Sequence, residues 1–503
     1  MVEKSGICLS TRLNLAFVCF LGTIIVYALR SNVSFAIVCM VNSTALEITN
    51  QSIPVSQKES QCIRVTNLNE SFYEEKIEGE FAWNKPTQGH IHSAFFWGYM
   101  SSQILAGYLA SKFGARLVIG FAVLGGAILT LITPIAANTH VGAFIAVRAL
   151  LGFFQASTFP AMHTMWSVWA PPLERSLLTG VSYAGAQIGN VLIMPMSGLL
   201  CKYGPMGGWP SIFYVSGIVA LIWCALWFWF VSDTPQKHRR ISRNEKQYIT
   251  ESLNKESGKQ NDEAPPVPWS KILTSLPIWA IFVGHFAGDW GAYMMATSLP
   301  SFMNDVLGFD LTSMGFISSI PYLAYFLMIN IGCFVADTVQ HKKLLSTLNT
   351  RRVAMIAAFG CQAIFLILIG YAKCGQEVLV VVLITLSIGL SGIQYAGFVV
   401  NYLDVAPTFA GPILGIGNTI SCFAGILAPL TMGWLTPNGT KEEWQTVFYL
   451  TGAILIFGAI FFCIFAKGNI QPWAITNGKH GNRGDLSEDL LLTEKEKPKN
   501  IAA

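Results

Sequence analysis

The chain has 503 residues, of which 52% are hydrophobic and only 12% are charged, and its formal net charge is +4. Soluble proteins carry about 25% charged residues, so this composition excludes a soluble domain and predicts an all-α, polytopic membrane protein. The modest net charge gives no reason to expect a nucleic-acid partner.

Apolar runs long enough to cross a bilayer, which needs about 20 residues, number about twelve. In the first half they cover residues 13–41, 88–110, 116–137, 141–166, 177–200 and 211–231. In the second half they cover residues 275–303, 313–336, 353–373, 377–402, 411–435 and 445–467. The first run is too long for the apolar region of a cleavable signal peptide, so it is expected to be the first spanning helix.

The spans divide the chain into two six-helix halves. We expect a cytoplasmic N-terminus at 1–12, a first half at 13–232 with a long loop at 42–87, a cytoplasmic linker at 233–271, a second half at 272–467 and a cytoplasmic tail at 468–503. Lysine and arginine are concentrated on the linker side of the spans, which predicts that this side is cytoplasmic.

Glycosylation sequons support the same orientation. Asn50 and Asn69 lie in the first long loop and Asn438 lies in the last loop, and both loops fall on the non-cytoplasmic side. Glycans are added on that side of the membrane, so these three asparagines are the expected sites. The eleven cysteines show neither CxxC nor Cys/His spacing, so the sequence indicates no disulfide framework, metal site or cofactor.

Two arginines, Arg30 and Arg148, lie within predicted spans. A guanidinium stays ionised at physiological pH and is costly in a bilayer unless it faces water, a protein partner or an anionic ligand. Both arginines are therefore candidates to bind a transported anion. A packing ion pair or snorkelling to the headgroups is the alternative, and Arg30, nearer the end of its run, fits snorkelling better than Arg148.

Polar side chains recur at helical spacing in several spans. Tyr99, Gln187 and Asn190 are candidates to bind the polar part of a substrate, although isolated polar residues in membrane helices more often bond to other helices. His92 could carry a proton or simply be a neutral, hydrogen-bonded histidine. Asp289 could balance an arginine, carry a proton or help to hold a cation.

Longer motifs resemble one group of transporters. They are Phe95-Phe-Trp-Gly-Tyr99, the Gly107 to Arg116 loop, Trp169-Ala-Pro-Pro-Leu-Glu-Arg-Ser176, Val231 to His238, Asn401-Tyr-Leu-Asp-Val-Ala-Pro407, Glu443 to Tyr449 and Phe465-Ala-Lys-Gly468. These segments are similar to the major facilitator anion transporters that include sialin, the vesicular glutamate transporters and the sodium–phosphate cotransporter-like proteins. The resemblance is greatest to sialin and covers nearly all of the chain between the tails.

The resemblance implies an alternating-access transporter of organic anions, with Arg30 and Arg148 as the family's anion-binding arginines. His92 stands where the glutamate transporters have histidine, and His163 matches sialin's pattern. The chain departs from sialin at Leu151 and Gln155, where sialin has glutamates, and glutamine cannot titrate. The helix 7 arginine of the glutamate transporters corresponds to Gly288.

Coupling candidates are therefore His92, His163, Asp289 and Gln155, and the coupling ion could be H⁺ or Na⁺. The leading expectation is a proton- or voltage-coupled carrier of acidic sugars or acidic amino acids. A sodium-dependent phosphate cotransporter or a voltage-driven organic-anion carrier is the alternative. An anion channel or a non-transporting sensor is a rival of a different class.

No nucleophile, metal or phosphate-loop constellation suggests an enzyme. We expect a monomer in the lipid bilayer with a small anionic substrate, in an endolysosomal or vesicular membrane or in the plasma membrane. The segment Ser487 to Leu492 resembles an acidic dileucine sorting signal, although its spacing is unusual.

Overall fold

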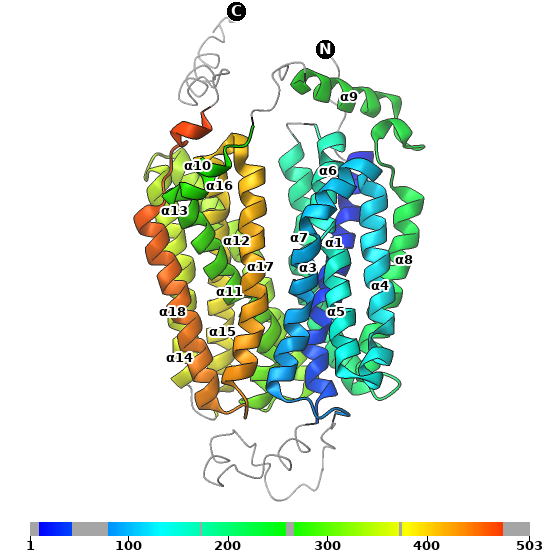
Figure 1. Ribbon diagram of the computed structural model, residues 1–503, viewed down its shortest axis with the longest axis vertical. Helices are drawn as coiled ribbons and strands as arrows, with labels where there is room; N and C mark the ends of the chain where they lie inside the picture. Colours follow the sequence, from blue (N-terminus) through cyan, green and yellow to red (C-terminus); the bar gives the residue numbers. More distant parts are fainter. Residues whose placement is uncertain (1–9, 43–78, 172–173, 258–265, 372–374, 476–503) are drawn as a thin grey trace, which may run out of the picture.

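The computed structural model describes residues 10–42, 79–171, 174–257, 266–371 and 375–475 and shows two bundles of long helices side by side (Figure 1). The N-terminal half contains α1 (Thr11–Met40), α3 (Lys85–Phe113), α4 (Ala115–Thr139), α5 (Val141–Gln155), α6 (Thr158–Trp169), α7 (Arg175–Tyr203) and α8 (Trp209–Phe230). The C-terminal half contains α11 (Leu276–Asp305), α12 (Leu311–His341), α13 (Thr347–Met355), η3 (Ile356–Gly360), α14 (Cys361–Tyr371), α15 (Glu377–Ser391), η4 (Gly392–Ala396), α16 (Phe398–Val405), α17 (Ala410–Leu435) and α18 (Lys441–Phe465).

The expected spans appear as helices in the expected places. Ten helical segments among the described residues are long and apolar enough to cross a membrane. The two remaining segments, α3 and α11, are as long, with 29 and 30 residues. They are less apolar because they carry more polar residues, such as Gln88, His92 and Gln103 in α3 and His285 and Asp289 in α11. The all-α, multi-pass fold predicted from hydropathy is confirmed.

Three spans that hydropathy reads as continuous are broken in the structure. The fourth is divided into α5 and α6 directly after Gln155, the ninth contains the π-helical turn η3, and the tenth contains the 3₁₀ segment η4. Such irregular turns often mark functional positions in helices. The break after η4 falls at Gly397, where an added Cβ atom would lie 2.7 Å from the sulfur of Met355, so only glycine fits without a shift of Met355.

The linker contains a helix that hydropathy did not predict, α9 (Arg243–Ser257), at one end of the bundle (Figure 1). We call this end, where α1 begins, the linker face, and the other end, where α3 begins, the loop face. The carboxylate of Glu245 in α9 accepts hydrogen bonds from the backbone N–H groups of Thr11 and Arg12, at 3.0 and 3.1 Å. It thereby satisfies donors that a helix N-terminus leaves unpaired.

Arg12 joins α9 to the N-terminal half. Its side chain is fully buried and forms ion pairs with Glu174 at 2.6 Å and with Glu245 at 3.1 Å. Tyr248 of α9 donates to the same Glu174 at 3.3 Å. Burial and the neighbouring Glu174 carboxylate raise the pKa of Tyr248. The linker is therefore attached to the bundle by a buried charge cluster.

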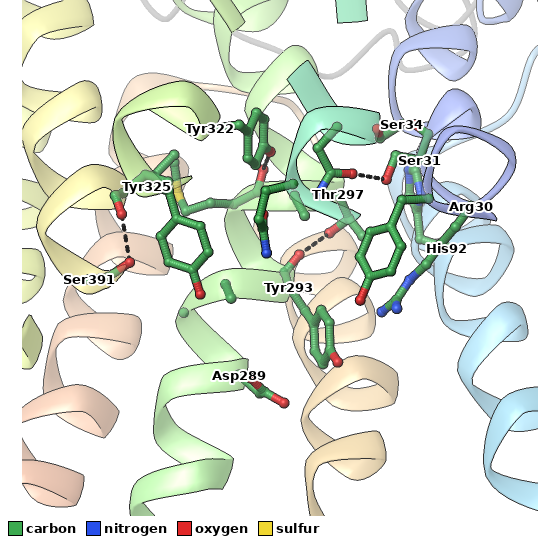
Figure 2. Close-up of a pocket in the computed structure, with 18 of the residues that line it drawn as sticks. Arg30, Ser31, Ser34, His92, Asp289, Tyr293, Thr297, Tyr322, Tyr325 and Ser391 are labelled. Atoms are coloured by element: carbon green, nitrogen blue, oxygen red, sulfur yellow. Dashed lines mark hydrogen bonds between the residues drawn. The ribbon is translucent and has the colours of Figure 1, made fainter. Parts of the chain in front are cut away.

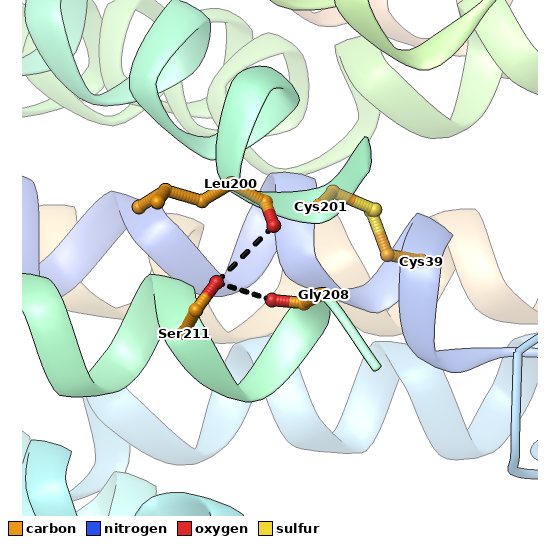
Figure 3. The surroundings of a disulfide bond; sticks show 5 residues. All are labelled: Cys39, Leu200, Cys201, Gly208 and Ser211. Atoms are coloured by element: carbon orange, nitrogen blue, oxygen red, sulfur yellow. Dashed lines mark hydrogen bonds between the residues drawn. A yellow bond between two sulfur atoms is a disulfide. The ribbon is translucent and has the colours of Figure 1, made fainter. Parts of the chain in front are cut away.

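A disulfide corrects the expectation that the cysteines form none. Cys39, near the end of α1, is bonded to Cys201, near the end of α7, with a Cα–Cα distance of 6.4 Å (Figure 3). Close by, the hydroxyl of Ser211 in α8 donates to the carbonyl oxygen of Leu200 at 3.1 Å. The two cysteines are 162 residues apart in the chain, so sequence spacing could not reveal the pair.

On the loop face the two halves are in close contact. A Cβ added at Gly198 of α7 would lie 2.7 Å from the carbonyl oxygen of Leu311 in α12, and one at Gly89 of α3 would lie 2.7 Å from that of Pro429 in α17. Lys85 and Asp305 form an ion pair across the same boundary. Small residues let membrane helices approach this closely. The loop face is therefore closed.

Of the predicted glycosylation sites, Asn438 is described and lies exposed in the loop between α17 and α18, on the loop face. Its side-chain amide donates to Glu443 at 2.8 Å. Asn50 and Asn69 lie outside the described residues, as does the segment Ser487 to Leu492.

Candidate anion site between the two halves

A pocket enclosing about 960 Å³ of empty space, part of it open to solvent, lies between the two halves. Its N-terminal wall comes from α1, α3, α5 and α7, and its C-terminal wall from α11, α12, α14, α15 and η4. Figure 2 shows its polar side chains projecting from both walls. Transporters of this architecture bind substrate near the midplane, between their repeats.

Arg148 of α5 reaches across to the backbone of α1. One guanidinium nitrogen donates to the carbonyl oxygen of Arg30 at 3.0 Å and another is 3.5 Å from that of Leu29. The side chain is only 3% exposed, and its Nε has no hydrogen-bond partner. A buried, ionised group with an unsatisfied donor is costly unless a ligand completes its shell.

Arg30 of α1 is surrounded by aromatic rings. Its guanidinium carbon lies 4.9 Å from the ring centre of Phe95, 4.8 Å from Phe96 and 5.0 Å from Tyr293. Arg148 lies over the same Phe95 ring, at 5.6 Å. Aromatic faces attract cations but leave the N–H groups at the guanidinium edge available to a carboxylate. Among the described residues, neither arginine has a carboxylate within 4.0 Å.

The other predicted substrate ligands are partly brought together with the arginines. Gln187 and Asn190 of α7 both line the pocket, and the Asn190 side chain accepts a hydrogen bond from Ser31 at 2.7 Å. Tyr99 does not line the pocket, but its ring centre is 6.0 Å from the Arg30 guanidinium. Tyr99 therefore sits behind Arg30, and its role as a direct ligand stays a prediction.

The C-terminal wall is rich in tyrosine. Tyr293, Tyr322, Tyr325 and Tyr395 all line the pocket. Gln362 lines it too, and its buried side-chain oxygen has no hydrogen-bond partner. Phenol and amide groups suit the hydroxyl or amide groups of a polar substrate. Periodicity within one helix did not group these tyrosines with Gln362, because the five residues come from four separate elements.

Asp289 is the only carboxylate among the described pocket residues. It accepts a hydrogen bond from Ser421 of α17 and lies 3.4 Å from the imidazole of His285, one turn earlier on α11. The other imidazole nitrogen of His285 is 2.9 Å from the hydroxyl of Tyr402 in α16. The sequence reading missed His285, although its i,i+4 spacing from Asp289 was a visible signal.

The three other coupling candidates lie in different surroundings. His92 lines the pocket and is 2% exposed, with its Nε2 unpartnered. His163 does not line the pocket and packs against Tyr183 with ring centres 5.5 Å apart. Gln155 does not line it either, and both polar atoms of its buried side chain lack a partner.

On the linker face the helices next to the pocket leave open space. A Cβ built at Gly180 of α7, or at Gly411 or Gly415 of α17, meets no atom within 4 Å. Gly180 is seven residues from the pocket residue Gln187, so it shares the α7 face that borders the pocket. Gly411 and Gly415 lie on α17, which packs against α11 beside the pocket. Together with the closed loop face, this places the unfilled space on the linker side of the pocket.

Two bundles of membrane-length helices that enclose a polar pocket are typical of a multi-pass membrane transporter. Residues 19–429 match the model of the Major Facilitator Superfamily. The chain is 45% identical to human sialin, covering 96% of this chain and 94% of sialin, and 36% identical to human vesicular glutamate transporter 2, covering 93% and 76%. It is also 53% identical to the Caenorhabditis elegans transporter slc-17.2, covering 94% of each chain.

The chain therefore belongs to the Major Facilitator Superfamily and, within it, to the family of sialin and the vesicular glutamate transporters. The inward-open xylose transporter XylE from E. coli has the same fold, with a TM-score of 0.65, 13% identity and coverage of 93% of this chain and 98% of that one. The bacterial homologue of Spinster aligns with a TM-score of 0.63 and 13% identity over 90% and 96%. The recognition from motifs is confirmed.

Proposed function

We propose that the protein is a secondary active transporter of organic anions in which Arg30 and Arg148 hold the substrate carboxylate. The observation that carries this proposal is a pocket with two permanent cations that share one aromatic ring and lack an ion-paired carboxylate among the described residues. A substrate carboxylate would supply the missing charge and accept bidentate hydrogen bonds.

Substrate class follows from the rest of the lining. Gln187 and Asn190 on one wall, and Gln362 with the tyrosines on the other, offer hydrogen bonds to hydroxyl and amide groups. This favours an acidic sugar over a small inorganic anion. Glycine at position 288 leaves no cation there for a second carboxylate, which disfavours glutamate.

The linker face is the cytoplasmic side in this proposal, and the loop face, with exposed Asn438, is lumenal or extracellular. The basic linker and the sequon support this orientation. Relatives named vesicular glutamate transporters support a vesicular membrane among the expected locations. Each half would rock about the pocket, and one chain contains a complete pocket, which fits a functional monomer.

Uptake into proteoliposomes tests the proposal. Radiolabelled sialic acid, glucuronate, glutamate and phosphate are compared under a proton gradient, a sodium gradient or voltage alone. Saturable uptake and counterflow of an organic anion are expected, and Arg148→Gln should lower both by about 10- to 100-fold without loss of folded protein. Sodium-driven phosphate uptake would favour the alternative cotransporter, and non-saturating current without counterflow would favour a channel.

A further inference from the structure

We propose that the His285–Asp289 pair of α11 is the proton-coupling site of this transporter, taking the place of the helix 4 glutamates that the chain lacks. This inference rests on the proposed anion transport. It assigns the coupling ion to a specific cluster in the C-terminal half, across the pocket from the anion-binding arginines.

The pair is built as a short chain of polar groups. Ser421 donates to Asp289, Asp289 lies 3.4 Å from one nitrogen of His285, and the other nitrogen lies 2.9 Å from the Tyr402 hydroxyl. The Asp289 side chain is 22% exposed at the pocket wall, whereas that of His285 is 9% exposed behind it. A proton can therefore reach the carboxylate from the pocket and be shared with the imidazole.

The neighbouring elements also place titratable or charged groups near Asp289. They are Tyr293 on its own helix, Arg30 and Tyr27 from α1, Tyr325 from α12, Tyr395 from η4, Tyr402 from α16 and Cys422 from α17. The charged residues of α15 and α18 are confined to their first turns, away from the pocket. Arg30 is the permanent cation in this set. Figure 2 shows Asp289 one turn from Tyr293, whose ring lies 5.0 Å from that cation.

Charge balance explains how the pair couples proton and anion. In the empty pocket, Asp289 is the only described carboxylate that offsets Arg30 and Arg148. The empty pocket carries a net charge of about +1 from Arg30, Arg148 and Asp289, and a bound monoanion lowers it to about zero. The added negative charge favours binding of one proton to the His285–Asp289 pair, which returns the net charge to that of the empty pocket. The transporter therefore changes conformation with the same pocket charge whether it is loaded or empty. The anion and the proton both leave on the other side, which restores the starting state.

His92, the histidine among the described pocket residues, is less suited to this task. It belongs to the N-terminal wall, which contains Arg30 and Arg148 and, among its described pocket residues, no carboxylate. A proton on His92 would add a third positive charge to that wall. Gln155 cannot carry a proton, and it lies outside the pocket lining.

The test separates coupling from transport in proteoliposomes with radiolabelled sialic acid. Counterflow needs binding and alternating access but no driving force, whereas accumulation above equilibrium needs proton coupling. For Asp289→Asn and His285→Gln we expect counterflow within about threefold of the wild type, loss of accumulation driven by a pH gradient, and loss of the proton that accompanies each substrate. Asp289→Glu is expected to restore accumulation, and Asp337→Asn, an exposed carboxylate of α12, should behave as the wild type.

Wild-type-like accumulation in Asp289→Asn would overturn the assignment, as would loss of accumulation in His92→Gln with Asp289→Asn unaffected. Loss of counterflow in both pair variants, with normal melting temperatures, would assign the pair to substrate binding instead. If Asp289→Asn lost stimulation by sodium but kept proton-driven accumulation, Asp289 would be a sodium ligand, and the proton-coupling assignment would be overturned. Absence of any sialic acid counterflow in the wild type would instead contradict the proposed function.

Discussion

Arg148 of α5 donates a hydrogen bond of 3.0 Å to the backbone carbonyl oxygen of Arg30 in α1. This bond ties the Arg148 guanidinium to the backbone of α1 within the N-terminal half. The Arg30 guanidinium, in contrast, also contacts the Tyr293 ring of the C-terminal half at 5.0 Å. Movement of the two halves should therefore change the surroundings of Arg30 more than those of Arg148.

Replacement of either arginine should weaken substrate binding strongly. Hydrogen bonds to charged groups contribute about 1.5–3 kcal/mol, so Arg30→Gln and Arg148→Gln should lower uptake at low substrate concentration by about 10- to 100-fold. Arg30→Lys keeps the charge but loses the bidentate geometry, and should recover only part of the activity. Initial uptake rates measure the effect, and equal rates in Arg30→Gln and wild type would contradict the site.

The Lys85–Asp305 ion pair should stabilise the conformation that is closed on the loop face. Both side chains are largely buried, at 14% and 13% exposure, and the pair joins α3 to α11. Lys85→Asp should shift the equilibrium about tenfold toward the conformation that is open on the loop face. The reason is that two carboxylates of like charge then lie opposite each other in place of an ion pair. The double variant Lys85→Asp/Asp305→Lys should restore it.

Labelling of Gly415→Cys by a membrane-impermeant thiol reagent measures this equilibrium, because Gly415 borders open space on the linker side. The reagent should react more slowly in Lys85→Asp and at the original rate in the double variant. Equal labelling of all three proteins would show that the ion pair does not influence the gate.

Gly415 itself should matter for transport rather than for the conformation seen here. A leucine side chain at this position meets no atom within 4 Å of its Cβ, but it would obstruct the approach of the halves on the linker face. Gly415→Leu should therefore fold normally and lower counterflow by at least about tenfold. Gly360→Leu is the matched control, because Gly360 also borders open space but lies in η3, which packs against α13, α14 and α18 of the C-terminal half.

Loss of the Cys39–Cys201 disulfide should destabilise the protein. A disulfide closing a long loop contributes about 2–4 kcal/mol, so Cys39→Ser and Cys201→Ser should each lower the melting temperature by the same amount. Reduction of the wild type should lower it equally. Cys361→Ser, at a free cysteine, is the control and should leave the melting temperature unchanged.

The buried cluster at Arg12 should be required to hold α9 in place. Arg12→Met leaves the carboxylates of Glu174 and Glu245 without their shared cation, which costs about 3–5 kcal/mol for a buried pair. Limited proteolysis within α9 should become faster in this variant. Protection equal to that of the wild type would show that other contacts hold the helix.

The sequence by itself determined the number, length and order of the spanning helices, because the thickness of the bilayer acts on each apolar run locally. It also identified Arg30, Arg148 and Asp289, since an ionised side chain is conspicuous in such a run. Motifs along the chain were sufficient for the family, which does not depend on distances between helices.

Only the tertiary structure decided which of these residues meet. It brought Arg30 and Arg148 over one Phe95 ring, left Tyr99 and Gln155 outside the pocket lining, and joined Cys39 to Cys201 across 162 residues. It also joined His285 and Asp289 into a polar chain that ends in the hydroxyl groups of Tyr402 and Ser421. These relationships depend on how helices pack against one another, and helical periodicity in a single segment carries no record of the neighbouring helix.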